Sequence, residues 1–220
     1  WRTLDQLNRE KEVVGIYISG HPLDDFKFEI DEFANASVID LENIEEIKKR
    51  RETRVAGIIT SVSHLTTKTG SPFGKFTLED YNGSYEFALF KDDYLRFKNY
   101  LNEYWFILIT TKLDTWYNKR EQKEINRLSV AKIDLLSELR DKMIKKIALD
   151  IPIDRLDDEL INRICRLCNQ NKGNIPIQVN IHEKDTRIEM PSRSIKVNLS
   201  RELTYELEQL DHIKWNVEKV

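Results

Sequence analysis

The chain has 220 residues, of which 40% are hydrophobic and 33% are charged, and a net charge of −3. This composition supports one large domain or two small ones, and only 7 Gly and 5 Pro exclude collagen-like and low-complexity chains. A mean hydropathy of −0.55, with no apolar run of 18 residues, excludes a membrane span. Two Cys residues are too few for a disulfide scaffold and indicate a reducing, cytoplasmic location. The start at Trp1 suggests a piece of a longer chain.

Positive charge is concentrated in the middle third of the sequence. Residues 1–52 contain 8 Lys and Arg against 13 Asp and Glu, whereas residues 53–132 contain 12 against 9. Residues 133–220 are nearly balanced, with 15 against 16. The local excess of cations matters more for a polyanionic partner than the negative total, so the middle third is the candidate binding region.

Residues 1–52 are predicted to be helical and to connect to the middle third. A first helix ends at Gly15, and a second begins at Pro22, where proline is favoured in a first helical turn. A short helix around Ile44 and Ile47 then leads into the basic run 48–51.

From Arg54 the hydrophobic period changes from that of a helix to that of a strand. We expect a bulge at Gly57 and a tight hairpin at Asn82-Gly83. A short helix over 92–101, started by an Asp pair, separates the third strand from the fourth. The five predicted strands are 55–65, 73–80, 84–90, 105–116 and 124–133. This order favours an OB-fold, a small closed barrel, over another five-stranded barrel or an α+β sheet.

The last third reads as a small α+β domain. A polar helix follows Lys132, and then the pattern predicts strand, helix, three strands and a final helix that begins at Ser200. The predicted strands are 146–151, 175–181, 187–190 and 194–199, with the first helix at 157–171. The whole chain is therefore expected to be α+β, mostly β, with a helical connector (1–52), an OB-fold nucleic-acid-binding domain (53–133) and a C-terminal domain (134–220).

None of the possible catalytic or metal-binding groups forms a complete site. The acidic pairs 24–25, 92–93 and 157–158 each lie at a predicted helix start, where carboxylates complement exposed N–H groups. Cys165 and Cys168 lie in the middle of a helix rather than at its N-terminus, and they have no second ligand pair. His21, beside Pro22, fits a packing or capping role. We therefore expect no catalytic residue, metal or cofactor.

The barrel and its loops carry the candidate binding residues. An OB-fold binds nucleic acid on strands 2 and 3, between the loops that join strands 1–2 and 4–5. Such binding needs cations for phosphates and exposed rings for bases. If Phe76 and Leu78 fill the barrel, the other phase of strand 2 faces outward. The candidate DNA-binding residues are Thr67, Lys68, Phe73, Lys75, Trp116, Tyr117, Lys119 and Arg120. Alternatively, Trp116 plugs the barrel and the two cations only solubilise the turn.

Several segments resemble the C-terminal region of the alpha, or catalytic, subunit of bacterial DNA polymerase III. They are GIYISGHPLDDF (15–26), VAGIIT (55–60), TTKTG (66–70), FGKFTLEDYNGSYEFALF (73–90) and the α+β tail. The resemblance covers nearly the whole chain in order. It implies that residues 53–133 lie near single-stranded template DNA and that residues 146–220 dock the tau subunit of the clamp loader.

The resemblance also implies that the catalytic carboxylates lie upstream of this sequence. The parent protein would be a DNA-directed DNA polymerase, a nucleotidyltransferase, whereas this chain would bind without polymerising. Two other functions stay open. The barrel could contact only proteins, as a scaffold within the replication machinery, or it could be a tRNA-binding OB-fold like the anticodon-binding domains of synthetases.

Overall fold

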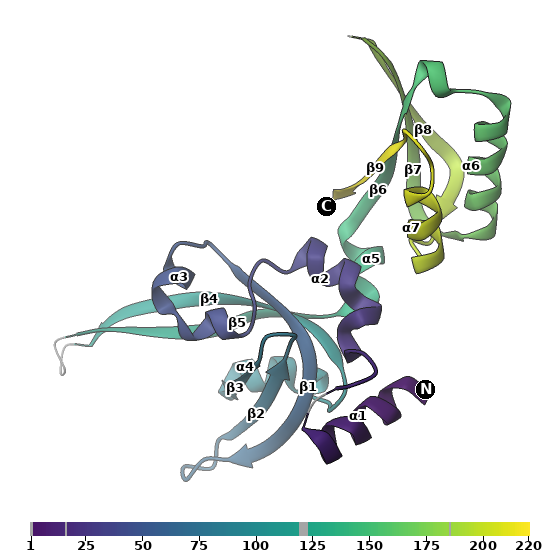
Figure 1. Cartoon of the computed structure of the whole chain (residues 1–220). Helices are drawn as coiled ribbons and strands as arrows, with labels where there is room; N and C mark the ends of the chain where they lie inside the picture. The colour runs from purple at the N-terminus through teal and green to yellow at the C-terminus, as the bar shows by residue number, and fades with distance from the viewer. Residues whose placement is uncertain (1, 16, 119–122, 185) are drawn as a thin grey trace. The chain divides into compact units, whose positions relative to one another are not determined.

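The computed structural model of the chain describes residues 2–15, 17–118, 123–184 and 186–220 (Figure 1). The chain divides into two compact units, Trp1–Ser137 and Glu138–Val220. The first contains the N-terminal helices and a five-stranded sheet, and the second contains a four-stranded sheet and further helices.

The helices predicted for the N-terminal segment are confirmed. The first ends where Gly15 adopts a φ of +86°, a left-handed conformation that glycine enters without steric cost. The helices are α1 (Arg2–Val14), η1 (Pro22–Phe26), α2 (Lys27–Phe33), η2 (Ile39–Glu42) and α3 (Ile44–Lys48).

The sheet of the first unit has the strand order β3-β2-β1-β4-β5, and every neighbouring pair is antiparallel. Its strands are β1 (Thr53–Thr66), β2 (Pro72–Glu79), β3 (Ser84–Phe90), β4 (Phe106–Asn118) and β5 (Lys123–Leu135). α4 (Lys91–Phe97) and η3 (Lys98–Tyr100) lie between β3 and β4, as the sequence predicts. Strand order and helix position together confirm the OB-fold (Figure 1).

Two expectations about this sheet are wrong. The barrel is not closed by hydrogen bonds, because β3 and β5 are the two outer strands of the described sheet and do not pair. The bulge lies between Ile59 and Ser61, where β1 changes partner from β4 to β2, and not at Gly57. Gly57 is required for close approach instead, since a Cβ there would lie 2.4 Å from the carbonyl oxygen of Glu79.

Alternating side chains of β2 and β3 fill the core of the first unit. Phe76 and Leu78 on β2 and Phe87 and Leu89 on β3 are at most 4% exposed. They pack in one cluster with apolar residues of β1, β4 and β5. Burying each such side chain stabilises the fold by about 1.5–3 kcal/mol, and it fixes which residues of β2 remain outside.

The N-terminal segment covers the other side of β1 and β4. Ala56 and Ile58, which alternate with the core residues of β1, are also buried, and they pair with Leu108 and Phe106. The ring of Phe26 lies 4.8 Å from the ring of Phe106. The helical segment is therefore part of the folded unit and covers the outer side of this part of the sheet.

Asp80 organises the turn between β2 and β3. Its carboxylate accepts hydrogen bonds from the backbone N–H groups of Asn82 and Gly83, and also from that of Val38 at 2.8 Å. The Asn-Gly pair predicted the hairpin correctly, but neither residue has a positive φ, so the side chain of Asp80 sets the turn.

The second unit contains a sheet with the strand order β8-β7-β6-β9. β6 and β7 are parallel and are joined through α6, which shares a side of the sheet with α7 (Figure 1). The strands are β6 (Ile144–Pro152), β7 (Lys172–Glu183), β8 (Thr186–Val197) and β9 (Lys214–Lys219). The helices are α5 (Leu136–Met143), η4 (Ile153–Arg155), α6 (Asp158–Gln170) and α7 (Arg201–Glu208).

The predicted element order of this unit is wrong at its end. Residues 187–190 and 194–199 do not form two strands, because β8 runs through both as one irregular strand. The final helix is followed by β9, which the sequence analysis missed. Only Trp215 and Val217 mark it, and both need β6 beside them, where they pair with Leu149 and Ile147.

The buried carboxylate of Asp80 gives a prediction for stability. Asp80→Ala removes the acceptor of three backbone N–H groups. That of Val38 is buried, and an unsatisfied buried group costs about 1–3 kcal/mol, whereas water can reach the N–H of the exposed Asn82. We expect urea denaturation to show a loss of about 1–3 kcal/mol in the first unit. Asp114→Ala, at an exposed position of β4, is the control and should change stability by less than about 0.5 kcal/mol. Equal effects of the two variants would contradict the role of Asp80.

Candidate nucleic-acid interface

One stretch of sheet surface, formed by β1, β2 and β3, remains outside the core. Cross-strand pairing arranges its side chains in three rows that run across the strands. The outward positions are Ser61, Ser63 and Leu65 on β1, Phe73, Lys75 and Thr77 on β2, and Glu86, Ala88 and Phe90 on β3. We call these nine residues the outer face.

An apolar row crosses the outer face at one end. Leu65 pairs with Phe73, and Phe73 pairs with Phe90. The two phenyl rings are stacked, with centroids 5.2 Å apart and planes inclined by 11°. Leu65 is 43% exposed and Phe90 is 40% exposed. Phe73 lies in the outward phase of β2, as the sequence predicts, but it is only partly exposed and its ring is stacked on that of Phe90.

Two cations flank this row. Lys75 also faces outward, as predicted, but its ammonium lies 2.7 Å from the carboxylate of Glu86. Arg127, which β5 contributes, holds its guanidinium 5.8 Å from the centre of the Phe90 ring. Cation and ring attract each other at that distance, so Arg127 extends the aromatic row toward β5.

The loop between β1 and β2 is a tight turn that uses one of the predicted binding residues. Thr67 accepts a hydrogen bond from the N–H of Ser71 through its hydroxyl and donates its own N–H to the carbonyl of Ser71. Gly70 has a φ of +84°, which closes the turn. Lys68 is exposed. The Thr67 hydroxyl is therefore engaged in the turn, and Lys68 is the residue of this loop that is available to a ligand.

The remaining predicted residues belong to the long hairpin of β4 and β5. Trp116 and Tyr117 stand opposite Ile125 and Glu124 in the strand pairing. Their side chains, and Lys119 and Arg120 entirely, lie outside the described residues. This hairpin extends beyond Thr111, the last residue of β4 that pairs with β1 (Figure 1). We call it the arm.

Sequence reasoning missed Leu65, Phe90 and Arg127. Leu65 and Phe90 share the outward phase of their strands, so a second pass over the alternation could have found them. No local signal could have found Arg127, because its partner ring belongs to β3, which does not pair with β5.

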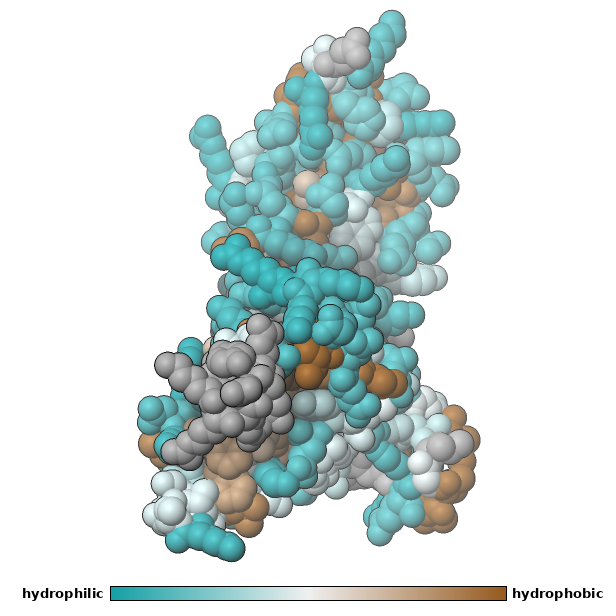
Figure 2. Space-filling view, turned by 90° about the vertical axis from the view of Figure 1, so that its left-hand side faces the viewer, coloured by the Kyte–Doolittle hydropathy of each residue, from teal (hydrophilic) through white to brown (hydrophobic). Residues whose placement is uncertain are grey.

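Figure 2 shows the surface from the side on which the arm points at the viewer. This surface is mostly hydrophilic, with separate hydrophobic patches.

The GHPL motif forms a clasp between the N-terminal segment and the hairpin of β2 and β3. The His21 ring accepts a hydrogen bond from the N–H of Leu23 and packs 4.4 Å from the ring of Tyr81, which agrees with the predicted capping role. The Tyr81 hydroxyl donates to Asp24 at 3.0 Å, and burial raises the pKa of Tyr81 strongly. Cavities of about 520 and 560 Å³ lie on either side of this clasp.

The structure also describes the acidic pairs and the cysteines that the sequence offered as possible catalytic or metal-binding groups. Asp157 caps α6 by accepting from the N–H of Leu160 at 2.8 Å. Cys168 is buried, which raises the pKa of its thiol, while Cys165 is exposed on the same helix. Within the described part of the chain, no three His, Cys, Asp or Glu side chains are placed to hold a metal ion, and no helix is long and apolar enough to cross a membrane.

Comparison with known families finds one match. Residues 147–218, nearly the whole second unit, match the family described as "DNA polymerase III alpha subunit, C-terminal domain". The DNA polymerase III subunit alpha of Halalkalibacterium halodurans is 28% identical over 207 residues, which are 94% of this chain and 18% of that protein. The subunit of Pseudomonas aeruginosa is 25% identical over 83% of this chain and 15% of its own length. The chain thus spans less than a fifth of these relatives.

Among solved structures, the mitochondrial single-stranded DNA binding protein Rim1 of S. cerevisiae aligns with 39% of this chain and 94% of its own. The identity is 13% and the TM-score is 0.28. A likeness this slight carries no functional argument, so the outer face must be interpreted from its own residues.

The clasp makes a prediction for pH dependence. Burial lowers the pKa of His21 below its usual 6.5, so the folded state holds the ring neutral. As the pH falls through 6.5, the unfolded chain takes up this proton first, and the folded state loses stability. We expect His21→Asn, which keeps a capping oxygen, to lose less stability between pH 7 and pH 5 in urea denaturation than the unchanged chain. The exposed His212→Asn is the control, and an unaltered pH dependence in His21→Asn would contradict the prediction.

Proposed function

We propose that this chain, a homologue of the C-terminal region of bacterial DNA polymerase III alpha subunits, binds single-stranded DNA on the outer face of its OB-fold. The stacked pair of Phe73 and Phe90 carries this proposal, since Phe73 is partly exposed and Phe90 is 40% exposed. Unpaired bases stack on such rings whatever their sequence, because every base has a π-face. The chain would thus guide template strands in the cytoplasm, where bacterial DNA is replicated.

The cations around the rings support contacts with the DNA backbone. Lys68 is exposed in the loop of β1 and β2, and Arg127 lies beside Phe90. Lys75 must first exchange Glu86 for a phosphate, which weakens its contribution. With about three phosphate contacts on a single strand, the logarithm of the binding constant should fall with the logarithm of salt concentration at a slope of about −2.

The test is a titration of fluorescein-labelled oligo-dT at low salt with Phe73→Ala and Phe90→Ala. Loss of one stacked base costs about 1–3 kcal/mol, so each variant should bind about 5- to 150-fold more weakly. The triple variant Trp116→Ala, Lys119→Ala, Arg120→Ala tests in the same assay whether the arm contributes, as we propose.

Tyr205→Ala is the matched control, since Tyr205 is 60% exposed and belongs to the second unit. It should leave affinity unchanged. Unaltered binding by both phenylalanine variants would overturn the outer face as the site, and unaltered binding by the triple variant would remove the arm from it.

We propose that the second unit binds the tau subunit of the clamp loader. The support is that the matched C-terminal family covers residues 147–218, nearly all of this unit. Surface plasmon resonance of the chain with purified tau should give saturable binding that excess oligo-dT does not compete away. Absence of binding, or full competition by DNA, would contradict a separate protein site.

The same measurements separate the two rival functions. Binding of tau without any binding of oligonucleotide would favour a protein scaffold. The ion pair of Lys75 with Glu86 is the observation that supports that reading, because it neutralises one of the outward cations. Stronger binding of tRNA than of oligo-dT would favour a tRNA-binding module.

A further inference from the structure

A second group of cations lies where β1 begins and the arm leaves the barrel. In the fold, the start of β1 lies beside β4 and β5, and we call this group the basic corner. Its cations are Lys48, Lys49, Arg50, Arg51 and Arg54 near the start of β1, Lys112 on β4 and Lys132 on β5. None of these residues belongs to the outer face.

Four carboxylates neutralise part of the basic corner. Lys48, Lys49, Lys112 and Lys132 pair with Glu45, Glu46, Glu52 and Asp134 respectively. The Arg50 side chain donates to a backbone carbonyl, that of Asn35, at 2.6 Å, and forms no ion pair among the described residues. Within the described part of the chain, Arg51 and Arg54 form no ion pair. Three arginines thus leave the corner with a net positive charge.

Asn35 holds the backbone that carries these arginines. Its side-chain oxygen accepts from the N–H of Arg54 at 2.7 Å, and its side-chain nitrogen donates to the carbonyl of Glu52 at 3.1 Å. Its backbone N–H donates to the carbonyl of Arg54. Asn35 thus fixes residues 52–54, and its carbonyl also holds the side chain of Arg50. Arg50 and Arg54 are therefore ordered before a ligand binds, which lowers the entropy lost on binding.

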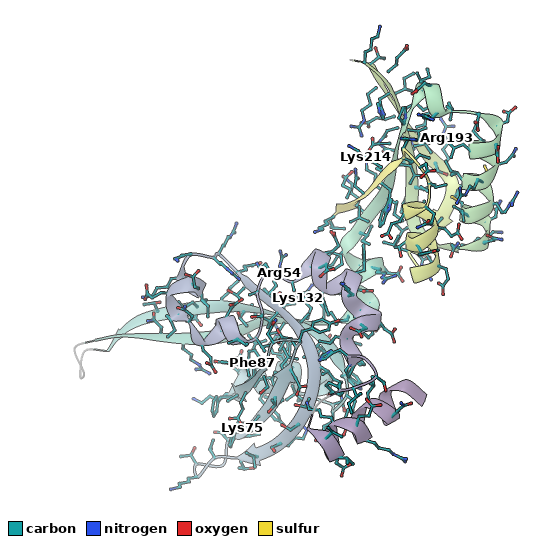
Figure 3. The ribbon with its side chains drawn as sticks, viewed as in Figure 1. Arg54, Lys75, Phe87, Lys132, Arg193 and Lys214 are labelled. Atoms are coloured by element: carbon teal, nitrogen blue, oxygen red, sulfur yellow. The ribbon has the colours of Figure 1, made fainter. Side chains whose placement is uncertain are left out.

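Arg54 itself lacks an acceptor. It is half-buried, and its Nε is fully buried without a hydrogen-bond partner in the described structure. Arg54 pairs with Thr110, which pairs with Lys132, so the arginine and the lysine lie on the same face two strands apart. Figure 3 shows both near one another and away from Lys75. Two strand spacings put them about 10 Å apart.

We propose that the basic corner binds phosphodiester groups of a nucleic acid as a second site, separate from the outer face. Arg51 is exposed and has no carboxylate partner among the described residues. A guanidinium in that state suits phosphate, which accepts two parallel hydrogen bonds from it. A carboxylate-bearing partner would bring the same charge. Ile44, on the helix that carries Lys48, is 39% exposed and is an apolar residue beside the corner. The arginines favour a nucleic acid nevertheless, because contacts with repeated phosphates need no apolar anchor, whereas a protein interface is centred on one.

The position of the corner suggests that it holds DNA beyond the bases that stack on the outer face. Arg54 and Leu65 are eleven residues apart on β1, which is at most about 36 Å along a strand. The inference rests on the proposed function for the claim that the chain binds DNA. It does not rest on the outer face, because the residues of the basic corner are different ones.

The test uses two variants, the double variant Arg51→Gln, Arg54→Gln and the single variant Phe73→Ala. For each, binding of a dT25 strand is measured over a series of salt concentrations. Losing two phosphate contacts should reduce the salt slope by about 1.4 and weaken binding at low salt by about tenfold. Phe73→Ala should weaken binding without changing the slope. Lys27→Gln with Lys98→Gln removes the same charge from other exposed positions and is the control.

Each outcome decides between the two sites. An unchanged slope in the arginine double variant, with Phe73→Ala still weakened, overturns the basic corner and leaves the outer face standing. A reduced slope with no effect of Phe73→Ala does the reverse. Arg54→Lys keeps the charge without the planar fork and should fall between. Thermal unfolding should be unchanged in the arginine variants, since Arg54 Nε has no hydrogen-bond partner to lose.

A further experiment uses a duplex with a dT25 overhang. It tests whether duplex phosphates also bind.

Discussion

The alternation of β2 is the constraint on which the rest of the first unit depends. Phe76 and Leu78 must enter the core, and a shift of one residue would expose them and bury Lys75. The same alternation in β3 buries Phe87 and Leu89 and leaves Phe90 outside, opposite Phe73. The aromatic pair on the outer face is therefore a by-product of core packing.

The N-terminal segment covers a different part of the sheet from the outer face. Leu23 and Phe33 are almost fully buried and lie in the helices that cover the outside of β1 and β4. Asp80 and the clasp of His21 and Tyr81 then fix that segment to the hairpin of β2 and β3. The motif GHPL that carries the family resemblance thus has a structural role, because it joins the N-terminal helices to the hairpin of β2 and β3.

Charge is distributed around the barrel rather than gathered on one face. The outer face offers Lys75, which is already paired with Glu86, and Lys68 and Arg127 lie next to it. The basic corner is held by Asn35 and leaves three arginines without carboxylate partners. Such an arrangement suits a ligand whose negative charge is repeated along its length, because separate weak contacts then act on one molecule.

Periodicity in the sequence was enough to determine the helices of residues 1–52, the five strands and the outward direction of Phe73 and Lys75, because each depends on neighbours a few residues away. Only the tertiary structure decided the rest. β1 bulges at Ile59–Ser61 because it changes partners there, β9 is a strand because β6 lies beside it, and Arg127 meets Phe90 across strands that do not pair. In the same way, Arg54 and Lys132 share a face only because β4 lies between β1 and β5. These features depend on contacts between distant segments, and the hydrophobic pattern of one segment does not record which other segment will cover it.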